Sequence, residues 1–292
     1  MRIYNYDPED KFFLNEREAD IDPITKTFML PAYATFVAPP TNWPKGTIPV
    51  FNGTNWDIVE DKFWRPEYEE VNYYSGKDTC GIPQLPKIDM SLFTFFPPIP
   101  RMMNPTLFGI RFANRIEIIN IYVRNVFKKH QSFISNHVAI SPLELLAYKT
   151  EIEIIIYLIK KSIDDLITLH YIKLFIEDIK KRHRLEIQGI GKLLVCKQNK
   201  CIKLVRKSIS FDKYQRFLVT INDVHNSFKH DLFISETDIL IGKTLPTVCA
   251  ISTQRGNFNK VKVHNHFLGQ LIISFSDFLI DNLINFCGSV VL

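Results

Sequence analysis

The chain has 292 residues, of which 46% are hydrophobic and 23% are charged. This composition excludes an intrinsically disordered chain, and the length predicts one large domain or two smaller ones. Five cysteines without dense spacing exclude a disulfide framework. The first residues lack the apolar run of a signal peptide, and the longest apolar runs are too short for a membrane span. We therefore expect no membrane association.

The net charge of +5 is distributed unevenly along the chain. Residues 1–70 hold 7 Lys and Arg against 13 Asp and Glu, a net charge of −6, so the remainder carries +11. This asymmetry predicts two modules with different surfaces. A basic second module could bind RNA, DNA or another acidic surface, although helices with solvated lysine faces give the same pattern.

The first 70 residues are rich in turn-forming and aromatic residues. They hold eight of the 16 prolines and all three tryptophans, Trp43, Trp56 and Trp64. Frequent prolines disfavour a helix, and two apolar runs on either side of Asn52-Gly53 predict a β-hairpin with a tight turn. The sequence therefore predicts a small Pro- and Trp-rich β module in residues 1–70.

Five short elements in this module occur in a distinctive order. They are Ile3–Pro8, Ala19–Pro23, Leu30–Thr35, Ala38–Pro40 and Val50–Asp61. Their order and spacing resemble the N-terminal segment of phage tail-fibre and tail-associated proteins, and the resemblance covers about a quarter of the chain. The present sequence departs from that pattern at Phe63–Pro66, where an Arg-Gly pair is usual in those proteins.

The resemblance implies a phage or prophage origin and a phage tail or tail-assembly protein as the partner. It also implies a location in the bacterial cytoplasm or in the virion. Exposed aromatic residues suit protein recognition, so Trp43, Trp56 and Trp64 are the candidate binding residues of this module. Alternatively, the tryptophans form the core of a small β module.

Residues 71–104 are predicted to be a Pro-rich connector. Their apolar run Leu92–Phe96 is expected to pack along one of the domains. From about Pro105 the apolar residues recur at three or four positions, which predicts a helix. A second helix should begin at Ser141-Pro142-Leu143-Glu144, a capping box with proline in the first helical position.

The second helix should end near Lys181 or break near His170. A third helix is predicted from Phe211 to about His230, and a fourth from about His264. Residues 105–292 are therefore predicted to form an antiparallel helical bundle. The predicted fold class is α+β, a small β module followed by a mainly α-helical bundle.

The third helix ends in the segment Asn222–His230, which places polar residues on one stripe. The segment resembles the HEPN superfamily of helical bundles, whose motif is Arg, a polar residue, three further residues and His. His225, Asn226 and His230 stand at the three motif positions, so the Arg is replaced by His. In such proteins the motif residues of two protomers act on RNA, which implies a possible homodimer.

His230, His225 and Asn226 are therefore the candidate catalytic residues. Two histidines could share the roles of base and acid in cleavage at a ribose 2′-OH. His lacks the permanent charge of Arg, however, which weakens the case for catalysis. Alternatively, His230 interacts with the dipole at the end of its helix, and Asn226 bonds a neighbouring loop.

The run Lys180–Arg184 lies in the densest basic region of the chain, and Lys181, Arg182 and Arg184 are its candidate phosphate contacts. Solvated helix ends have similar sequences. His264 and His266 could approach His225 and His230, but no carboxylate lies at a usual ligand spacing. We therefore predict no metal site and no cofactor.

The sequence is consistent with two alternative functions. The first is a phage- or prophage-encoded interaction protein that is tail-associated or acts in phage–host conflict. The second is a HEPN-like, metal-independent ribonuclease of an antiphage or phage-exclusion system. Whether the protein is an enzyme is uncertain from its sequence.

Overall fold

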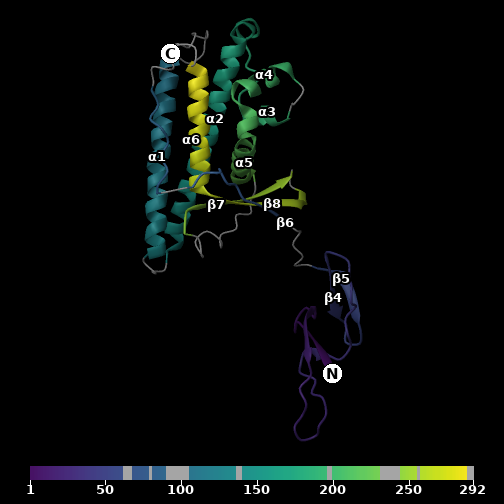
Figure 1. The fold of residues 1–292 in the computed structure, drawn as a ribbon. Helices are drawn as coiled ribbons and strands as arrows, with labels where there is room; N and C mark the ends of the chain where they lie inside the picture. The colour runs from purple at the N-terminus through teal and green to yellow at the C-terminus, as the bar shows by residue number, and fades with distance from the viewer. Residues whose placement is uncertain are drawn as a thin grey trace. The chain divides into compact units, whose positions relative to one another are not determined.

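The computed structural model describes residues 1–61, 68–78, 81–89, 105–135, 140–195, 199–230, 244–254 and 257–287. The chain divides into two compact units, Met1–Glu67 and Tyr68–Leu292. Short strands make up the regular structure of the described part of the first unit, and long helices dominate the second (Figure 1). The fold is therefore mixed α+β.

The first unit contains two small antiparallel sheets. Strand β1 (Arg2–Tyr6) lies between β2 (Phe13–Glu18) and β3 (Ala34–Thr35). Strands β4 (Thr47–Phe51) and β5 (Trp56–Glu60) form a hairpin in which Phe51 pairs with Trp56. The hairpin predicted around Asn52-Gly53 is confirmed.

The hairpin turn depends on its first two residues. The Asn52 side-chain oxygen accepts hydrogen bonds from the backbone N–H groups of Thr54 at 3.0 Å and Asn55 at 2.8 Å. Gly53 has a φ of +104°, a conformation that side chains disfavour. Local residue chemistry therefore specifies this turn without help from the rest of the fold.

Trp56 is the centre of the small core of the first unit. Its side chain lies among Tyr6, Phe13 and Phe51, with ring centroids 5.2–6.5 Å away. The residue is only 9% exposed, and its indole N–H donates to the Val37 carbonyl at 2.8 Å. The expectation that Trp56 is a binding residue is therefore corrected, because it belongs to the core.

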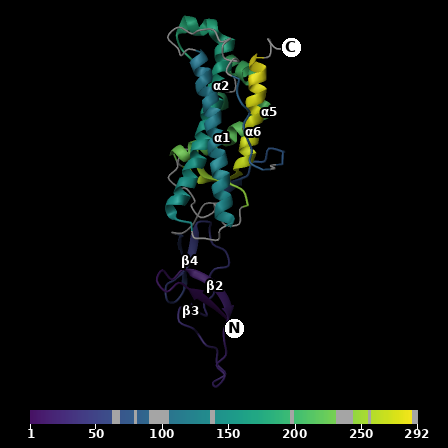
Figure 2. The ribbon, with the colours of Figure 1, turned by 90° about the vertical axis from the view of Figure 1, so that its left-hand side faces the viewer.

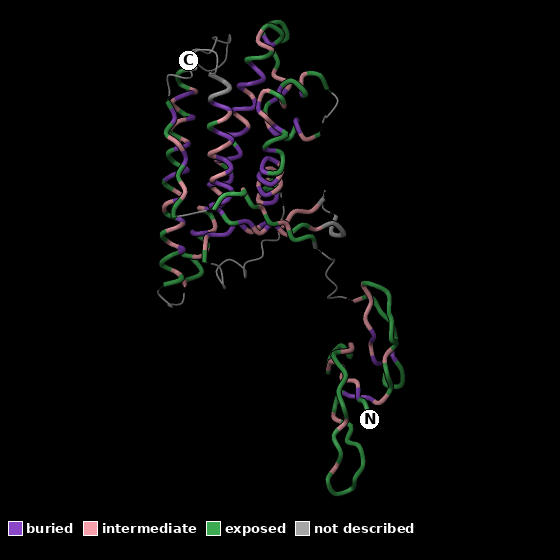
Figure 3. Tube along the Cα trace, in the orientation of Figure 1, coloured by how far each residue is buried: buried purple, intermediate pink, exposed green. Residues whose placement is uncertain are grey.

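Four long helices lie side by side in the second unit (Figures 1 and 2). They are α1 (Pro105–Ser135), α2 (Pro142–Arg182), α5 (Phe211–His230) and α6 (Leu268–Cys287). Two short helices, α3 (Ile190–Val195) and α4 (Lys200–Ser208), connect α2 to α5. Figure 3 shows many buried residues along these helices and mostly exposed residues in the first unit.

Helix α2 begins and ends as its sequence predicts. The Ser141 hydroxyl accepts from the Glu144 backbone N–H, and the Glu144 carboxylate accepts from the Ser141 backbone N–H. His183 ends the helix in a left-handed conformation with a φ of 51°. The backbone leaves helical geometry at Phe175, five residues after the predicted alternative break.

A three-stranded sheet accompanies the helices of the second unit. Strand β8 (Asn257–Phe267) pairs in parallel with β6 (Tyr68–Val71) and antiparallel with β7 (Thr247–Gln254). The predicted fourth helix is confirmed as α6, but it begins at Leu268 and not near His264, which lies within β8. The backbone of β8 is hydrogen-bonded to strands on both sides. This pairing outweighs the helical spacing of apolar residues that the sequence shows near His264.

Residues 68–89, where described, pack as part of the second unit and do not form a free connector. The Tyr73 hydroxyl bonds the Ser274 hydroxyl at 2.7 Å. The Asn120 amide accepts from the Leu85 N–H at 2.8 Å and donates to the Leu85 carbonyl at 3.2 Å. The Asn120 side chain thereby satisfies both backbone groups of Leu85, as a neighbouring strand would. The predicted packing of Leu92–Phe96 lies outside the described residues.

Replacement of Trp56 by Ala should unfold the first unit. Loss of a buried tryptophan costs about 3–5 kcal/mol, which is comparable to the whole stability of so small a core. All three tryptophans lie in the first unit, so tryptophan fluorescence during urea unfolding reports on this unit alone. Trp43→Phe is the control, since Trp43 is 38% exposed. A loss below about 1 kcal/mol for Trp56→Ala would show that the residue is not a core residue.

Candidate functional site

The neighbouring residues His225 and Asn226 of helix α5 differ in exposure. The His225 ring stacks on Tyr157 of α2, with centroids 6.0 Å apart, whereas Asn226 is exposed. Burial, together with the nearby charge of Lys160, lowers the pKa of His225. A neutral imidazole cannot supply the permanent charge of the Arg that the HEPN-like motif lacks. The side chain of His230 lies outside the described structure.

Beside His225, a buried ion pair ties α2 to the start of α3. Lys160 is 8% exposed, and its ammonium contacts the Asp164 carboxylate at 2.6 Å. The other Asp164 oxygen accepts from the Ile190 backbone N–H at 2.9 Å. A buried charge is tolerated when it is paired and hydrogen-bonded in this way. These contacts assign a structural role to the ion pair.

His264 and His266 form a buried chain of hydrogen bonds. The Tyr73 backbone N–H donates to His266 Nδ1 at 3.0 Å. His266 Nε2 lies 3.2 Å from His264 Nδ1, and His264 Nε2 lies 2.9 Å from the Ser252 hydroxyl. Burial lowers the pKa of both rings, that of His266 to about 3, so both are neutral at pH 7.

The direction of these hydrogen bonds follows from the first donor, the Tyr73 backbone N–H. Because His266 Nδ1 accepts from Tyr73, the proton of neutral His266 is on Nε2 and is donated to His264 Nδ1. The proton of neutral His264 is then on Nε2 and is donated to the Ser252 hydroxyl. A serine, a base and an orienting residue follow one another here, as in hydrolases, but the proton is on the wrong atom for His264 to activate Ser252. The chain is therefore structural in this state.

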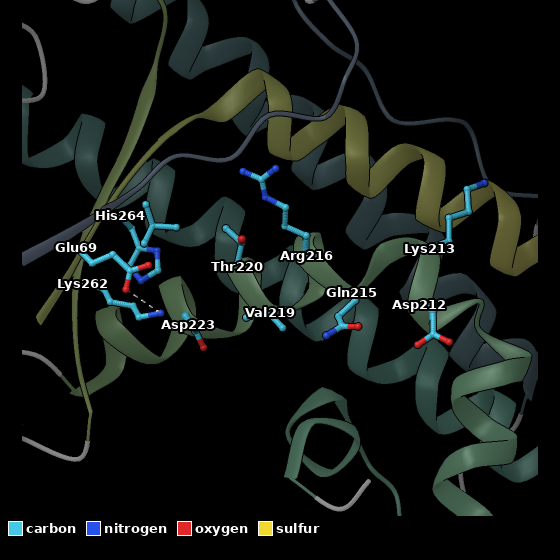
Figure 4. A pocket seen from close by; sticks show the side chains of 11 residues that line it. Glu69, Asp212, Lys213, Gln215, Arg216, Val219, Thr220, Asp223, Lys262 and His264 are labelled. Carbon is cyan, nitrogen blue, oxygen red and sulfur yellow. Dashed lines mark ion pairs between the residues drawn. The ribbon is translucent and has the colours of Figure 1, made fainter. Parts of the chain in front are cut away.

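A hollow of about 500 Å³ lies beside His264, between α5 and strands β6 and β8 (Figure 4). Each cation at its edge has a partner. Lys262 pairs with Glu69 at 3.4 Å, and Lys213 pairs with Asp281 at 2.6 Å. Arg216 donates to the Asn72 carbonyl at 2.9 Å and lies over the Tyr73 ring. Two of these three cations are paired with carboxylates and Arg216 is held by a carbonyl and a ring, which weakens the hollow as an anion site.

A second hollow, of about 840 Å³, lies between the end of α2 and helices α3 and α4. The candidate phosphate contact Arg184 lines it together with Lys192, and neither has an acidic partner among the described residues. Lys181 is exposed nearby, whereas Arg182 pairs with Glu186 at 3.0 Å. The structure thus brings part of the predicted basic run to a hollow in which Arg184 and Lys192 have no paired carboxylate within the described ranges, while its two carboxylates, Asp164 and Glu186, pair with Lys160 and Arg182.

The first unit carries an exposed apolar loop that the sequence analysis did not single out. Ile21 bridges Phe28 across the loop, and the Asp22 carboxylate accepts from the backbone N–H groups of Ile24 and Thr25. These hydrogen bonds lower the pKa of Asp22. Ile24 at the tip is 89% exposed. In the sequence, the only indication of this loop is that apolar residues flank the turn-forming pair Asp22-Pro23.

The three predicted tryptophans have different positions. Trp56 is buried, and Trp43 is 38% exposed with its ring edge-on to Phe13 at 6.2 Å. Trp64 lies outside the described residues. Trp43 is therefore the one of the two described tryptophans that a partner could contact.

No family model, curated protein or solved structure matches this chain. Within the described ranges, no helix combines the length and apolar character needed to cross a membrane. In the same residues, no three His, Cys, Asp or Glu side chains come together in a way that could hold a metal ion. The candidate sites therefore rest on their own geometry.

Acidification should destabilise the second unit through its buried histidines. Burial lowers the pKa of His170 to about 4 and that of His266 to about 3, against 6.5 when unfolded. The unfolded chain then binds protons that the folded chain cannot, so stability present above pH 6.5 is lost as pH falls. The loss from pH 7 to pH 5 should be about 2 kcal/mol per histidine.

Urea unfolding followed by circular dichroism at the two pH values measures this loss. The His170→Gln/His266→Gln variant provides the comparison, because it removes both titrating groups and keeps polar side chains. An equal dependence on pH in the variant and the wild type would contradict the assignment.

Gly189 should be indispensable for the contact between α2 and α3. A Cβ at this position would lie 2.5 Å from the Asp164 carboxylate oxygen that accepts from Ile190. Gly189→Ala should therefore cost about 1–3 kcal/mol by displacing Asp164 from its partners. Gly191→Ala is the matched control, because a Cβ there meets nothing within 4 Å. Equal unfolding free energies of the two variants would contradict this account.

Proposed function

We propose that the protein is a phage- or prophage-encoded interaction protein whose first unit docks onto a phage tail or tail-assembly protein. The observation that carries the proposal is the exposed apolar loop of residues 19–33. We also propose that the helices of the second unit form a bundle related to HEPN-like proteins, to which a three-stranded sheet has been added. Their side-by-side arrangement supports this (Figure 1).

The loop exposes apolar side chains on a hydrogen-bonded backbone. Its large exposed residues are Ile21, Ile24, Phe28, Met29, Leu30 and Tyr33. The backbone N–H of Asp22 donates to the Thr27 carbonyl at 2.9 Å, and that of Met29 donates to the Asp20 carbonyl at 2.8 Å. A loop that is already ordered loses little conformational entropy on binding, and exposed apolar groups gain from burial.

The loop coincides with residues that carry the resemblance to tail proteins. Two of the five elements, Ala19–Pro23 and Leu30–Thr35, form its two arms. The acidic charge of residues 1–70 disfavours a nucleic acid as the partner of this unit. Apolar exposure, order and resemblance thus support a protein partner at the same place.

The ribonuclease alternative has weaker support. Its motif lacks the Arg, and His225 is stacked on Tyr157 with a lowered pKa. Asn226 is exposed, and its side-chain hydrogen bond to His225 raises the pKa of that ring by less than burial lowers it. This placement favours packing of α5 against α2 over acid–base chemistry at His225.

Capture of tail proteins tests the proposed function. The tagged full-length protein is incubated with a lysate of induced cells that carry the parent phage or prophage, and bound proteins are identified by mass spectrometry. We expect enrichment of a tail or tail-assembly protein, reduced at least about tenfold in the Ile24→Asp/Phe28→Asp variant, since charges oppose apolar docking.

Leu14→Asp is the matched control, because Leu14 is 50% exposed on β2, outside the loop. Tryptophan fluorescence verifies that the first unit of each variant is folded. Absence of any tail or tail-assembly protein, or equal capture by the loop variant and the control, would refute the proposal.

A further inference from the structure

The end of α2, helix α3 and helix α4 form a strongly basic surface, called here the basic projection and comprising residues 180–195 and 199–207. These residues include nine Lys and Arg and one acidic residue, Glu186. Helices α3 and α4 lie on the side of the second unit away from α1 (Figure 1). The positive charge of the second unit is therefore concentrated in one part of its surface.

Most of these cations have no acidic partner in the part of the chain that the structure describes. Three are paired: Lys180 with Glu177, Arg182 with Glu186 and Arg206 with Asp212. Six others make no ion pair with any described residue: Lys181, Arg184, Lys192, Lys200, Lys203 and Lys207. The hollow beside His264 differs, because two of its three cations, Lys213 and Lys262, are paired with carboxylates. Uncompensated cations on one surface attract a polyanion and release its counterions on binding.

We propose that the basic projection binds duplex nucleic acid through its phosphates. Lys192, Lys200 and Lys203 are exposed on short helices, which hold them in fixed relative positions. Arg184 and Lys192 line the hollow of about 840 Å³, whose two carboxylates, Asp164 and Glu186, are already paired with Lys160 and Arg182. Contacts of this kind position a protein on a duplex without reading its sequence.

The composition of the projection favours a duplex over a single strand. Residues 180–207 contain no Phe, Tyr or Trp. Proteins that bind single strands stack bases on aromatic side chains, which contributes about 1–3 kcal/mol per base. A surface of lysine and arginine alone suits the regular phosphate rows of a duplex, whose bases remain stacked on one another.

The packing of α4 disfavours a membrane surface as the partner. Its apolar residues Ile202 and Val205 are 4% and 0% exposed, because they face the core of the second unit. An interfacial helix needs that apolar face for the lipid. Leu204 is exposed, so lipid vesicles form one arm of the experiment below. The inference goes beyond the proposed function, because the docking loop belongs to the other unit.

Fluorescence anisotropy with the full-length protein tests the inference. The probes are a labelled 24-base-pair DNA duplex, an RNA duplex of the same sequence and the single strands of each. Vesicles with phosphatidylserine are assayed separately by co-sedimentation. We expect the wild type to bind a duplex more tightly than single strands or vesicles, and its affinity to fall steeply with salt. A difference between the two duplexes identifies the preferred nucleic acid.

Two variants with equal net charge distinguish a site from a general charge effect. Lys192→Gln/Lys200→Gln/Lys203→Gln removes three charges from the projection. Lys87→Gln/Lys128→Gln/Lys229→Gln removes three exposed charges elsewhere in the second unit. The first variant should bind a duplex at least about tenfold more weakly and reduce the salt slope by about 2–3, and the second should change affinity less than about twofold.

Three outcomes would overturn the inference: no duplex binding at 50 mM salt, tighter binding to single strands or vesicles, or equal weakening by the two variants. Circular dichroism verifies that both variants are folded. Loss of duplex binding leaves the capture of tail proteins by the first unit unaffected, so the two proposals fail separately.

Discussion

Burial of α2 on several sides is the constraint on which the second unit depends. The consecutive residues Ile155 and Ile156 are both fully buried, as are Leu166 and Ile167. Neighbouring residues of a helix point about 100° apart, so the apolar surface of α2 cannot be covered by one partner. Helices α1, α4, α5 and α6 all contact it. Lys160 is tolerated in this environment because Asp164 pairs with it.

Polar side chains then attach extended segments to this helical core. Asn120 satisfies both backbone groups of Leu85, and the chain from Tyr73 through His266 and His264 joins the segment after β6 to the sheet. Each bond satisfies a group whose burial without a partner would cost about 1–3 kcal/mol. Burial holds both imidazoles neutral, and His264 donates to Ser252 and does not accept its proton, so the Ser252–His264–His266 chain is structural.

The two units present different surfaces to their surroundings. The first has an acidic composition and an ordered loop with exposed apolar side chains, which fits a protein partner. The second concentrates unpaired cations on residues 180–195 and 199–207, which fits a polyanion. The charge asymmetry visible in the sequence thus corresponds to chemically distinct surfaces on separate units.

The sequence by itself determined the features that depend on neighbouring residues. The Asn52-Gly53 turn and the capping box at Ser141 follow from local hydrogen bonds and permitted backbone angles. Only the tertiary structure decided that His264 lies in the central strand of a sheet, because it pairs with Ala250 on one side and, on the other, with Val71, almost 200 positions earlier in the chain. It also decided that Trp56 is buried, that His225 faces α2, and which lysines lack partners. These properties depend on which distant segments pack together, and no local pattern specifies the partner.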